Sequence, residues 1–336
     1  MSSKTMIPSG YQSCLGLYDT QKAIGLLNNI FQVKLCAALH LKRVTAPLFV
    51  DAASGLNDNL NGTERPVGFD VPAGGYKAEV VHSLAKWKRM ALADYGFFPG
   101  NGLLTNMNAI RRDEEMDNLH SIYVDQWDWE KIITPEERTP AFLQATVRRI
   151  VDAICGTLDE LQWEFPALTI NLTREVTFIT AEALLQKYPQ MDAKSRENAI
   201  AKECGTVFII GIGGKLSNGE RHDGRAPDYD DWGLNGDLLF WHEGLCRAIE
   251  ISSMGIRVDE ASLSRQLTEA GCDERRALPF HKRLLEGALP LTIGGGIGQS
   301  RLCMLLLGKV HVGEVQVSLW DEETRAACQA AGIALL

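Results

Sequence analysis

Apolar residues recur at helical spacing in two long stretches of the chain. In residues 20–40 the apolar stripe consists of Ile24, Leu27, Phe31, Leu35 and Ala38. The second stretch begins at Thr139-Pro140, a cap residue followed by a first-turn proline, and its stripe consists of Leu143, Val147, Ile150, Val151, Ile154, Leu158 and Leu161. Shorter helices are predicted over residues 84–95, with Ser83 as the N-cap, over residues 192–204 and from Gly298 onward. We expect the two long helices to pack against a core.

Extended segments lie between these helices. Residues 44–50 are extended but contain Pro47, which belongs at a sheet edge because proline cannot donate to the ladder. In residues 120–130 a period of two places Ile122, Val124, Gln126 and Asp128 on one face. Further strands are predicted over residues 78–83, 206–210, 236–241 and 246–253. Because many strands follow one another without a helix between them, we predict one α+β domain over residues 1–336 with a largely antiparallel sheet.

Composition and charge narrow the range of partners. The chain is 45% hydrophobic and 23% charged, close to an average globular protein. Its 43 acidic and 34 basic residues give a formal net charge of −9, whereas proteins that bind nucleic acid usually carry a basic face. No apolar run approaches the ~18–20 residues that cross a bilayer. We therefore expect neither a nucleic-acid nor a membrane partner.

The cysteines and the N-terminal residues indicate a cytoplasmic protein. The eight cysteines are never closer than 22 positions, so the sequence contains no Cys-x-x-Cys pair for zinc or dithiol chemistry. Most of them lie in apolar stretches, as expected for reduced, buried thiols. Residues 1–12 are polar and mixed, without the apolar core of a secretory signal.

Several familiar motifs fail when they are tested residue by residue. The loop 211–216 is not a P-loop, because Ile209 and Leu216 replace the first glycine and the magnesium-binding hydroxyl residue. In the glycine-rich run 294–301, Gln299 stands where a dinucleotide fingerprint needs its third small residue. The sequence contains no nucleophile elbow, and Ser2 stands where an N-terminal glutaminase would carry cysteine.

Charged residues nevertheless gather in four segments. Lys86 and Lys88 lie in the first turns of a predicted helix, against the preference of the helix dipole; they serve either an anionic ligand or a solvated basic face. Gln126 and Asp128 interrupt an otherwise apolar strand face and need partners. The alternation in residues 247–257 places Glu250 on the same side as Ser252.

Two of these segments suggest ligand sites. Asp237 lies on the strand preceding Glu250, so the two carboxylates could hold Mg²⁺; otherwise they are satisfied structural carboxylates. The glycine run 294–298 precedes a helix that carries Arg301. It offers either backbone amides and a guanidinium for a triphosphate or simply a tight turn.

Taken together, these segments resemble the catalytic domain of class II aminoacyl-tRNA synthetases, with three motifs in order. Val44-Thr-Ala-Pro47 resembles the first motif, Arg111 before strand 120–129 the second, and Gly296-Ile-Gly-Gln-Ser-Arg301 the third. Within that superfamily the similarity is greatest to the ammonia-dependent asparagine synthetases, and it runs from about Gln21 to Trp320. It rests on these segments: Val80–Arg89, His120–Glu130, Arg225–Trp232, Leu234–Asp237, Ser252–Arg257 and Thr292–Leu302.

The resemblance implies a reaction and an assembly. An enzyme of this family converts L-aspartate, ATP and ammonia to L-asparagine, AMP and pyrophosphate, as a homodimer with Mg²⁺. The dimer interface would include the helix over residues 21–40 and the strand through Pro47. Ammonia rather than glutamine would supply the nitrogen, because no glutaminase nucleophile is recognisable.

The resemblance also implies residue roles. Arg111 would bind the α-phosphate and the reacting carboxylate, Arg301 the outer phosphates, and Gly296 and Glu250 would contribute to the ATP site. Arg111, Gln126 and Arg301 would be the catalytic residues. Asp237 and Glu250 would hold the metal. Aspartate would be held by Asp58, Lys88, Gln126, Asp128, Asp230 and Ser253, with Lys88 on a carboxylate and Asp58 or Asp230 on the ammonium group.

Two other functions use the same fold. One is a tRNA-binding paralogue related to aspartyl- or asparaginyl-tRNA synthetase, which would need an anticodon-binding module or a basic stripe. The other is an inactive regulatory subunit, which is disfavoured because the expected charged positions are all filled.

Overall fold

The computed structural model describes residues 5–58 and 64–336, so the prediction concerning Ser2 lies outside the described residues. The described helices are α1 (Leu17–Leu39), α2 (Ala85–Asp94), α3 (Pro140–Glu164), α4 (Ala181–Lys187), α5 (Ala193–Cys204), α6 (Glu260–Glu269), α7 (Pro279–Leu285), α8 (Gln299–Leu306) and α9 (Glu322–Ala330). The described strands are β1 (Leu41–Arg43), β2 (Phe49–Asp51), β3 (Gly68–Val71), β4 (Tyr76–Val80), β5 (Gly102–Ile110), β6 (Tyr123–Ile132), β7 (Thr177–Thr180), β8 (Thr206–Ile210), β9 (Asp230–His242), β10 (Arg247–Arg257) and β11 (Thr292–Gly298).

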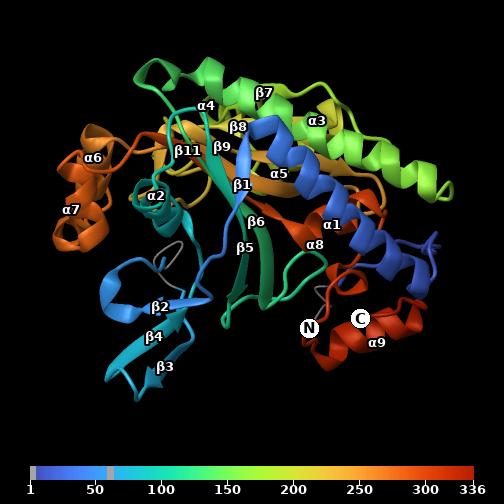
Figure 1. Ribbon diagram of the computed structural model, residues 1–336. Helices are drawn as coiled ribbons and strands as arrows, with labels where there is room; N and C mark the ends of the chain where they lie inside the picture. Colours follow the sequence, from blue (N-terminus) through green and yellow to red (C-terminus); the bar gives the residue numbers. More distant parts are fainter. Residues whose placement is uncertain (1–4, 59–63) are drawn as a thin grey trace.

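The main sheet is largely antiparallel, as the sequence predicts. Its strand order is β1-β5-β6-β11-β10-β9-β8-β7, and only the outer pairs β1–β5 and β7–β8 are parallel. Strands β2, β4 and β3 form a separate small antiparallel sheet, which projects from the main body in Figure 1. The fold is α+β, a mostly antiparallel sheet flanked by helices.

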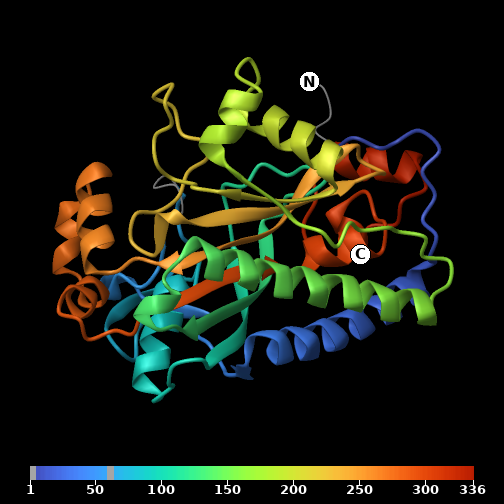
Figure 2. The same ribbon diagram turned by 90° about the horizontal axis from the view of Figure 1, so that it is seen from above.

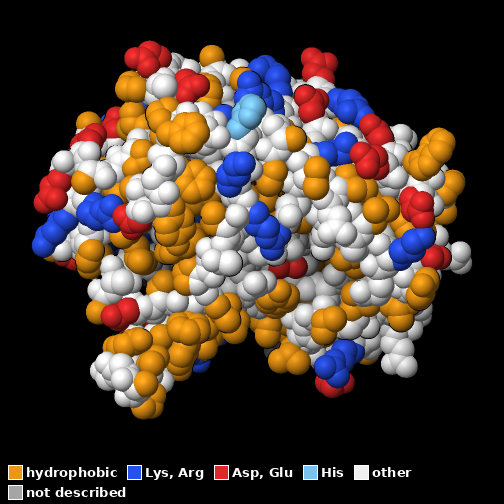
Figure 3. Space-filling view, in the orientation of Figure 1, with side chains coloured by type: hydrophobic (Ala, Val, Ile, Leu, Met, Phe, Trp, Pro, Cys, Tyr) orange, Lys and Arg blue, Asp and Glu red, His pale blue; other side chains and the backbone are white. Residues whose placement is uncertain are grey.

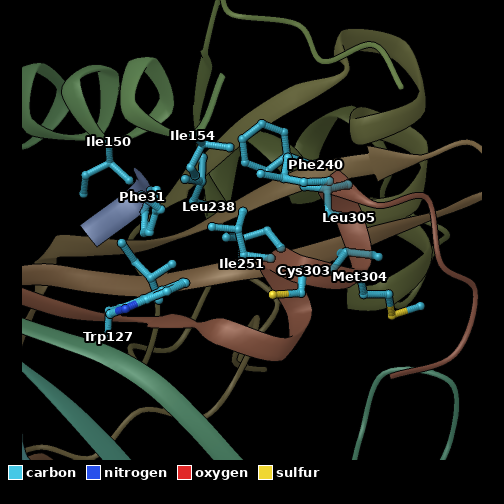
Figure 4. Packing of buried hydrophobic residues seen from close by; sticks show 14 of the residues in the cluster. Phe31, Trp127, Ile150, Ile154, Leu238, Phe240, Ile251, Cys303, Met304 and Leu305 are labelled. Atoms are coloured by element: carbon cyan, nitrogen blue, oxygen red, sulfur yellow. The ribbon is translucent and has the colours of Figure 1, made fainter. Parts of the chain in front are cut away.

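One face of the main sheet is covered by long helices. Figure 2 shows α1 and α3 running along the same side of the sheet, and α8 packs beside them. Both predicted stripes pack here: Leu27, Phe31 and Leu35 of α1 have no exposed surface, while Ile24 and Ala38 are partly buried against the core. The Phe31 ring lies 4.8 Å from that of Trp127 on β6, among the apolar side chains of Figure 4. This face therefore forms the hydrophobic core.

The opposite face of the central strands is polar. Since side chains alternate along a strand, the neighbours of Trp127 and Trp129, namely Gln126, Asp128 and Glu130, point away from the core. Helix α2 covers part of this face, and α4 and α5 cover its far end with a smaller apolar cluster. The face between them is left for charged side chains. No helix among residues 5–58 and 64–336 is long and apolar enough to cross a membrane.

The predicted continuous strand over residues 44–50 is wrong. The chain leaves the main sheet after β1 and enters the small sheet at β2, so Pro47 lies between two strands. Both strands are at sheet edges, as the proline argument requires. The predicted cap of α2 is shifted by one residue: Leu84 is the N-cap, while the Ser83 hydroxyl accepts from the Ala85 amide at 3.1 Å.

Candidate active site

A cavity of about 400 Å³ opens on the polar face of the sheet. All of the residues that sequence analysis selected line it, except Asp58 and Asp237. Each of these two residues is joined to a residue of the cavity lining by one hydrogen bond. The Asp58 carbonyl oxygen lies 3.0 Å from Nδ1 of His82, and the Ser253 hydroxyl donates to Asp237 Oδ1 at 2.7 Å. The structure therefore gathers residues from α2, β6, β9, β10, β11 and α8 around one space.

The glycine run 294–298 is part of strand β11, so the alternative of a tight turn is wrong. A Cβ atom at Gly296 would lie 2.5 Å from Oε1 of Gln126 and 2.9 Å from Oδ1 of Asp128. At Gly294 it would lie 1.9 Å from Oε2 of Glu130. Because such distances are far below van der Waals contact, glycine is required for the polar side chains of β6 to lie across the neighbouring strand.

Lys88 is buried, so the solvated basic face is the wrong alternative. Its side chain is 1% exposed; Nζ lies 2.8 Å from Oδ2 of Asp128 and donates to the Gly295 carbonyl oxygen at 3.0 Å. Lys86 is also buried and donates to the Asn57 carbonyl oxygen at 2.8 Å. Both lysines of α2 thus point into the protein, where Lys86 bonds to the segment at Asn57 and Lys88 bonds to strand β11.

Asp128 keeps one oxygen for a ligand. Its residue is 3% exposed, and Lys88 engages only Oδ2. Among the described residues, Oδ1 has no hydrogen-bond partner and is fully buried. A buried carboxylate oxygen without a donor is costly, and a ligand with an N–H group would remove that cost. A cationic or hydrogen-bonding group is expected here, beside Gly296.

A chain of alternating charges continues from Lys88 across the floor of the cavity. Lys88 Nζ lies 3.9 Å from Oε2 of Glu130, and Arg257 donates to both oxygens of Glu130, at 2.8 Å from Nη2 to Oε2 and 3.0 Å from Nε to Oε1. Arg257 also bonds to Asp230, which lies 3.7 Å from Nε of Arg225. We call Asp128, Lys88, Glu130, Arg257, Asp230, Arg225 and Asp237 the ion-pair chain.

Burial makes these pairings strong. Burial alone raises the pKa of Glu130, yet the adjacent Arg257 and Lys88 hold that pKa below the usual value. For Arg257 burial acts to lower the pKa, but Glu130 and Asp230 raise it above that of a free arginine. Glu130 and Arg257 therefore stay charged at neutral pH because each has an opposite charge beside it.

Arg111, Glu250 and Arg301 lie on another side of the cavity. We call these three the phosphate side, because the sequence resemblance predicts that they bind ATP. Nη1 of Arg111 lies 3.7 Å from Oε2 of Glu114, and its buried Nε has no partner among the described residues. Arg301 donates to the carbonyl oxygens of Leu119 at 3.4 Å and Glu250 at 3.2 Å. Within the described part of the chain, neither Arg301 nor the Glu250 carboxylate belongs to an ion pair, so both are available to a ligand.

Helix α8, which carries Arg301, is capped from another strand. Its N-cap residue Gly298 provides no side chain, but Oδ1 of Asp125 on β6 accepts from the Ser300 amide at 3.0 Å. Oδ2 of Asp125 accepts from the Ser300 hydroxyl at 2.7 Å. Burial raises the pKa of Asp125. The side chain of Asp125 thus caps the N-terminus of α8 and fixes the start of this helix relative to the sheet.

A bulge in β10 corrects one predicted orientation. The register with β9 shifts between Glu250 and Ser252, so Ser252 is opposite Leu238 and donates to the Gly296 carbonyl oxygen at 2.9 Å. Glu250 and Ser253, rather than Glu250 and Ser252, line the cavity. The extra residue of a bulge reverses the alternation that the sequence pattern assumes.

The two residues predicted to hold a metal differ in availability. Mg²⁺ usually binds one or two carboxylates together with water and substrate phosphates. Glu250 fits that role because it lines the cavity and has no ion pair within the described part of the chain. Asp237 is engaged by Arg225 and Ser253. The described residues contain no group of three or more His, Cys, Asp or Glu that could hold a metal.

Sequence analysis did not select Glu130, Arg225 or Arg257 as site residues. Glu130 continues the period of two through Gln126 and Asp128, and Arg257 continues it through Ser253 and Gly255. That alternation is a signal that could have found them. Arg225 lies in a loop without regular structure, and only the fold shows that it reaches Asp237.

A family model described as aspartate-ammonia ligase matches residues 18–332 of the chain. Among curated relatives, the aspartate–ammonia ligase of Clostridium perfringens is 57% identical over 334 residues, covering 99% of this chain and 99% of its own length. That of Lactobacillus acidophilus is 58% identical over 335 residues, with 99% and 100% covered. The similarity thus extends over the whole of both relatives.

Solved structures show the same fold at low identity. Asparaginyl-tRNA synthetase from Pyrococcus horikoshii, complexed with asparaginyl-adenylate, superposes with a TM-score of 0.65 and 16% identity over 91% of this chain and 70% of that chain. The enzyme from Entamoeba histolytica, with the same ligand, gives a TM-score of 0.61 and 16% identity, covering 89% and 66%. The catalytic fold is therefore that of the class II synthetases.

Proposed function

The chain belongs to the aspartate–ammonia ligase family, and from this premise we propose how its cavity makes asparagine. The reaction joins L-aspartate and ammonia at the expense of ATP, with release of AMP and pyrophosphate. The single observation that carries the residue assignment is the buried Oδ1 of Asp128 beside the paired Lys88, an oxygen without a hydrogen-bond partner in residues 5–58 and 64–336. It provides an acceptor for the α-ammonium group of an amino acid.

Aspartate lies, in this proposal, over the floor of the cavity. Asp128 and Asp230, with Asp58 at the edge, surround its ammonium group, while Lys88 faces a carboxylate and Gln126 and Ser253 bond to the remaining polar atoms. Lys88 is already paired with Asp128. It would therefore stabilise the substrate carboxylate mainly through its positive charge, and one of its N–H groups would reorient to donate to that carboxylate. The ion-pair chain has four carboxylates and three cations, and therefore a net charge of −1, which favours a cationic group.

In the first step the side-chain carboxylate of aspartate attacks the α-phosphorus of ATP and pyrophosphate leaves. Negative charge gathers on the phosphate oxygens, and fixed cations in a water-poor site stabilise it. We assign Arg111 to the α-phosphate and the attacking carboxylate, and Arg301 to the outer phosphates. Gly296 leaves room for the side chains of Gln126 and Asp128 beside the reacting groups.

In the second step ammonia attacks the carbonyl carbon of the β-aspartyl adenylate. The C–O bond to phosphate breaks, AMP leaves, and the added nitrogen loses a proton. No covalent intermediate with the protein is needed. We propose ammonia as the physiological nitrogen source. If the purified protein made asparagine from glutamine as fast as from ammonium, with free ammonia removed, this proposal would be wrong.

Magnesium would accompany ATP. Glu250 would hold it together with phosphate oxygens, and Asp237 would join once Arg225 releases its carboxylate. When bound, Mg²⁺ supplies positive charge to the phosphates of the departing pyrophosphate.

The assay that tests the proposed function is AMP formation from ATP and aspartate, with and without ammonium. AMP and asparagine should appear in equal amounts only when ammonium is present. An Asp128→Asn variant should raise the KM for aspartate by roughly 10-fold or more, because a bond to a charged group is worth ~1.5–3 kcal/mol. An unchanged KM would remove Asp128 from the aspartate site.

We propose that the protein is a homodimer and that residues 21–40 and the segment through Pro47 contribute to the interface. The apolar stripe of α1 is used inside the monomer, so the contact would use other residues. Val33, Leu48 and Phe49 are 68%, 53% and 49% exposed. Figure 3 shows apolar side chains gathered over the small sheet. A monomeric mass in light scattering at micromolar concentration, with full activity, would contradict this.

We also propose that residues 1–336 act as one catalytic unit in the cytoplasm. All eight cysteines are free thiols, which suits a reducing compartment. The tRNA-binding alternative is not favoured, since relatives of the same length and more than half identical are aspartate–ammonia ligases.

A further inference from the structure

We infer that Arg257 is a positioning residue for aspartate, acting through Asp230 and Glu130 without contacting the reacting atoms. This inference rests on the proposed function, because it takes the groups on either side of Arg257 to be the ones that bind aspartate. Its own basis is the geometry of one buried guanidinium that spans four strands.

Arg257 lies in the middle of the ion-pair chain and joins its two halves, because it pairs with both Glu130 and Asp230. From the end of β10, Nη1 bonds to Asp230 at the start of β9, while Nε and Nη2 bond to Glu130 on β6. The side chain is 3% exposed. Since β11 separates β10 from β6 in the sheet, the guanidinium reaches across β11 to make these bonds.

Two residues of β11 are adapted to this crossing. Gly294 gives it room, because a Cβ there would lie 1.9 Å from Oε2 of Glu130 and 2.7 Å from Nη2 of Arg257. Thr292 donates its hydroxyl to Oε1 of Glu130 at 2.7 Å. Glu130 is therefore held from three sides: by the two donors of Arg257, by Thr292 and by the charge of Lys88.

A guanidinium is planar and its donors diverge at fixed angles, so it sets the distance between the two carboxylates that it joins. Glu130 in turn faces Lys88, which pairs with Asp128. Through this sequence of contacts, Arg257 fixes Asp230 relative to Asp128. These are the two carboxylates that would surround the ammonium group of aspartate, so a small displacement of either weakens aspartate binding. No member of the phosphate side is involved.

Arg89 offers a matched control on α2. It is 2% exposed, like Arg257, and it also crosses between elements. However, among the described residues it donates only to backbone, at 2.6 Å to the Val258 carbonyl oxygen and 2.9 Å to that of Pro290. Burial lowers the pKa of Arg89 to about 10. Replacing Arg89 by lysine disturbs a buried arginine next to the same region without touching either aspartate-side carboxylate.

The test compares Arg257→Lys, Gly294→Ala and Arg89→Lys with the wild type. Aspartate-dependent ATP–pyrophosphate exchange gives the KM values for aspartate and ATP, calorimetry gives aspartate binding without turnover, and thermal melting gives stability. We expect Arg257→Lys and Gly294→Ala to raise the aspartate KM and Kd by ~10-fold or more, the scale of one charge-assisted bond, with the ATP KM nearly unchanged. Arg89→Lys should lower the melting temperature but leave both KM values near wild type.

If Arg257→Lys lowers the melting temperature but leaves the aspartate KM unchanged, Arg257 is merely structural and the inference is wrong. If it does not fold, Thr292→Val decides the same question, because it removes one bond to Glu130 and leaves every charge in place; an unchanged aspartate KM in that variant would also overturn the inference. Asp128→Asn separates this failure from that of the proposed function. An aspartate KM raised by Asp128→Asn but not by Arg257→Lys leaves the proposed function standing.

Discussion

On the floor of the cavity, each charged side chain from Lys88 to Asp237 has an opposite charge within 3.9 Å. On the phosphate side, Arg301 bonds only to carbonyl oxygens, and Nε of Arg111 has no partner among the described residues. Charges that hold one another stay in place before the substrate arrives. A cation without an ion pair among the described residues, as Arg301 is, can instead neutralise charge that a ligand brings and a reaction develops. The same cavity therefore combines a preorganised floor with a side that, in the proposed function, receives its electrostatic partners from ATP.

The largest expected effect is a loss of stability when the ion-pair chain on the floor of the cavity is interrupted. Glu130→Ala leaves Arg257 buried without its main partner, and such a loss costs about 3–5 kcal/mol in the free energy of unfolding. Urea denaturation measures it. Glu250→Ala is the matched change on the phosphate side, where the carboxylate has no ion pair among the described residues, and it should cost under ~0.5 kcal/mol. Equal losses in the two variants would mean that the floor and the phosphate side do not differ.

Arg301→Lys should have the opposite effect to Glu130→Ala: it should reduce activity and leave stability nearly unchanged. The variant keeps the positive charge but loses the planar guanidinium, which can donate two parallel hydrogen bonds. Because one charge-assisted bond is worth ~1.5–3 kcal/mol, we expect kcat/KM for ATP to fall roughly 10- to 150-fold. The melting temperature should hardly change, because Arg301 makes only carbonyl contacts. Unchanged ATP kinetics with a lower melting temperature would show that Arg301 merely holds α8.

Asp125→Ala should have a smaller effect on both properties. The loss of a helix cap costs about 0.5–2 kcal/mol, and kcat/KM for ATP should fall as well, because Asp125 fixes the start of the helix that carries Arg301. Asp321→Ala is a control, since Asp321 caps the distant α9 by accepting from the Thr324 amide at 2.8 Å. It should lower stability to a similar extent and leave ATP kinetics unchanged. If both variants lost ATP activity equally, the link from Asp125 to Arg301 would be wrong.

The smallest expected effect is on the stability of the protein at acidic pH. The folded protein holds the pKa of Glu130 below that of the unfolded chain, so this group's contribution to stability is complete above the unfolded pKa and disappears as pH falls through the folded one. Melting temperatures recorded downward from pH ~4.5 should fall more steeply for wild type than for Glu130→Gln. Parallel curves would exclude Glu130 as a source of the acid sensitivity.

Much of this arrangement could be predicted from local pattern. Thr139-Pro140 and the stripe that follows define α3, and the period of two in residues 122–128 orients Gln126 and Asp128 correctly. What could not be predicted depends on contacts between distant segments. The glycines at 294 and 296 indicate a turn until the side chains of β6 are placed beside them. The Glu250 bulge and the reach of Arg225 to Asp237 likewise depend on neighbouring strands. The family resemblance selected residues of the cavity but gave no role to Arg257, which also lines it.

The most direct test of the central claim follows one oxygen atom. If the side-chain carboxylate of aspartate attacks the α-phosphorus and ammonia then attacks the carbonyl carbon, one carboxylate oxygen remains on phosphorus when AMP leaves. Aspartate labelled with ¹⁸O in its side-chain carboxylate should therefore give AMP that carries one ¹⁸O atom for each asparagine formed, as measured by mass spectrometry. Unlabelled AMP, or label found in pyrophosphate instead, would contradict the account.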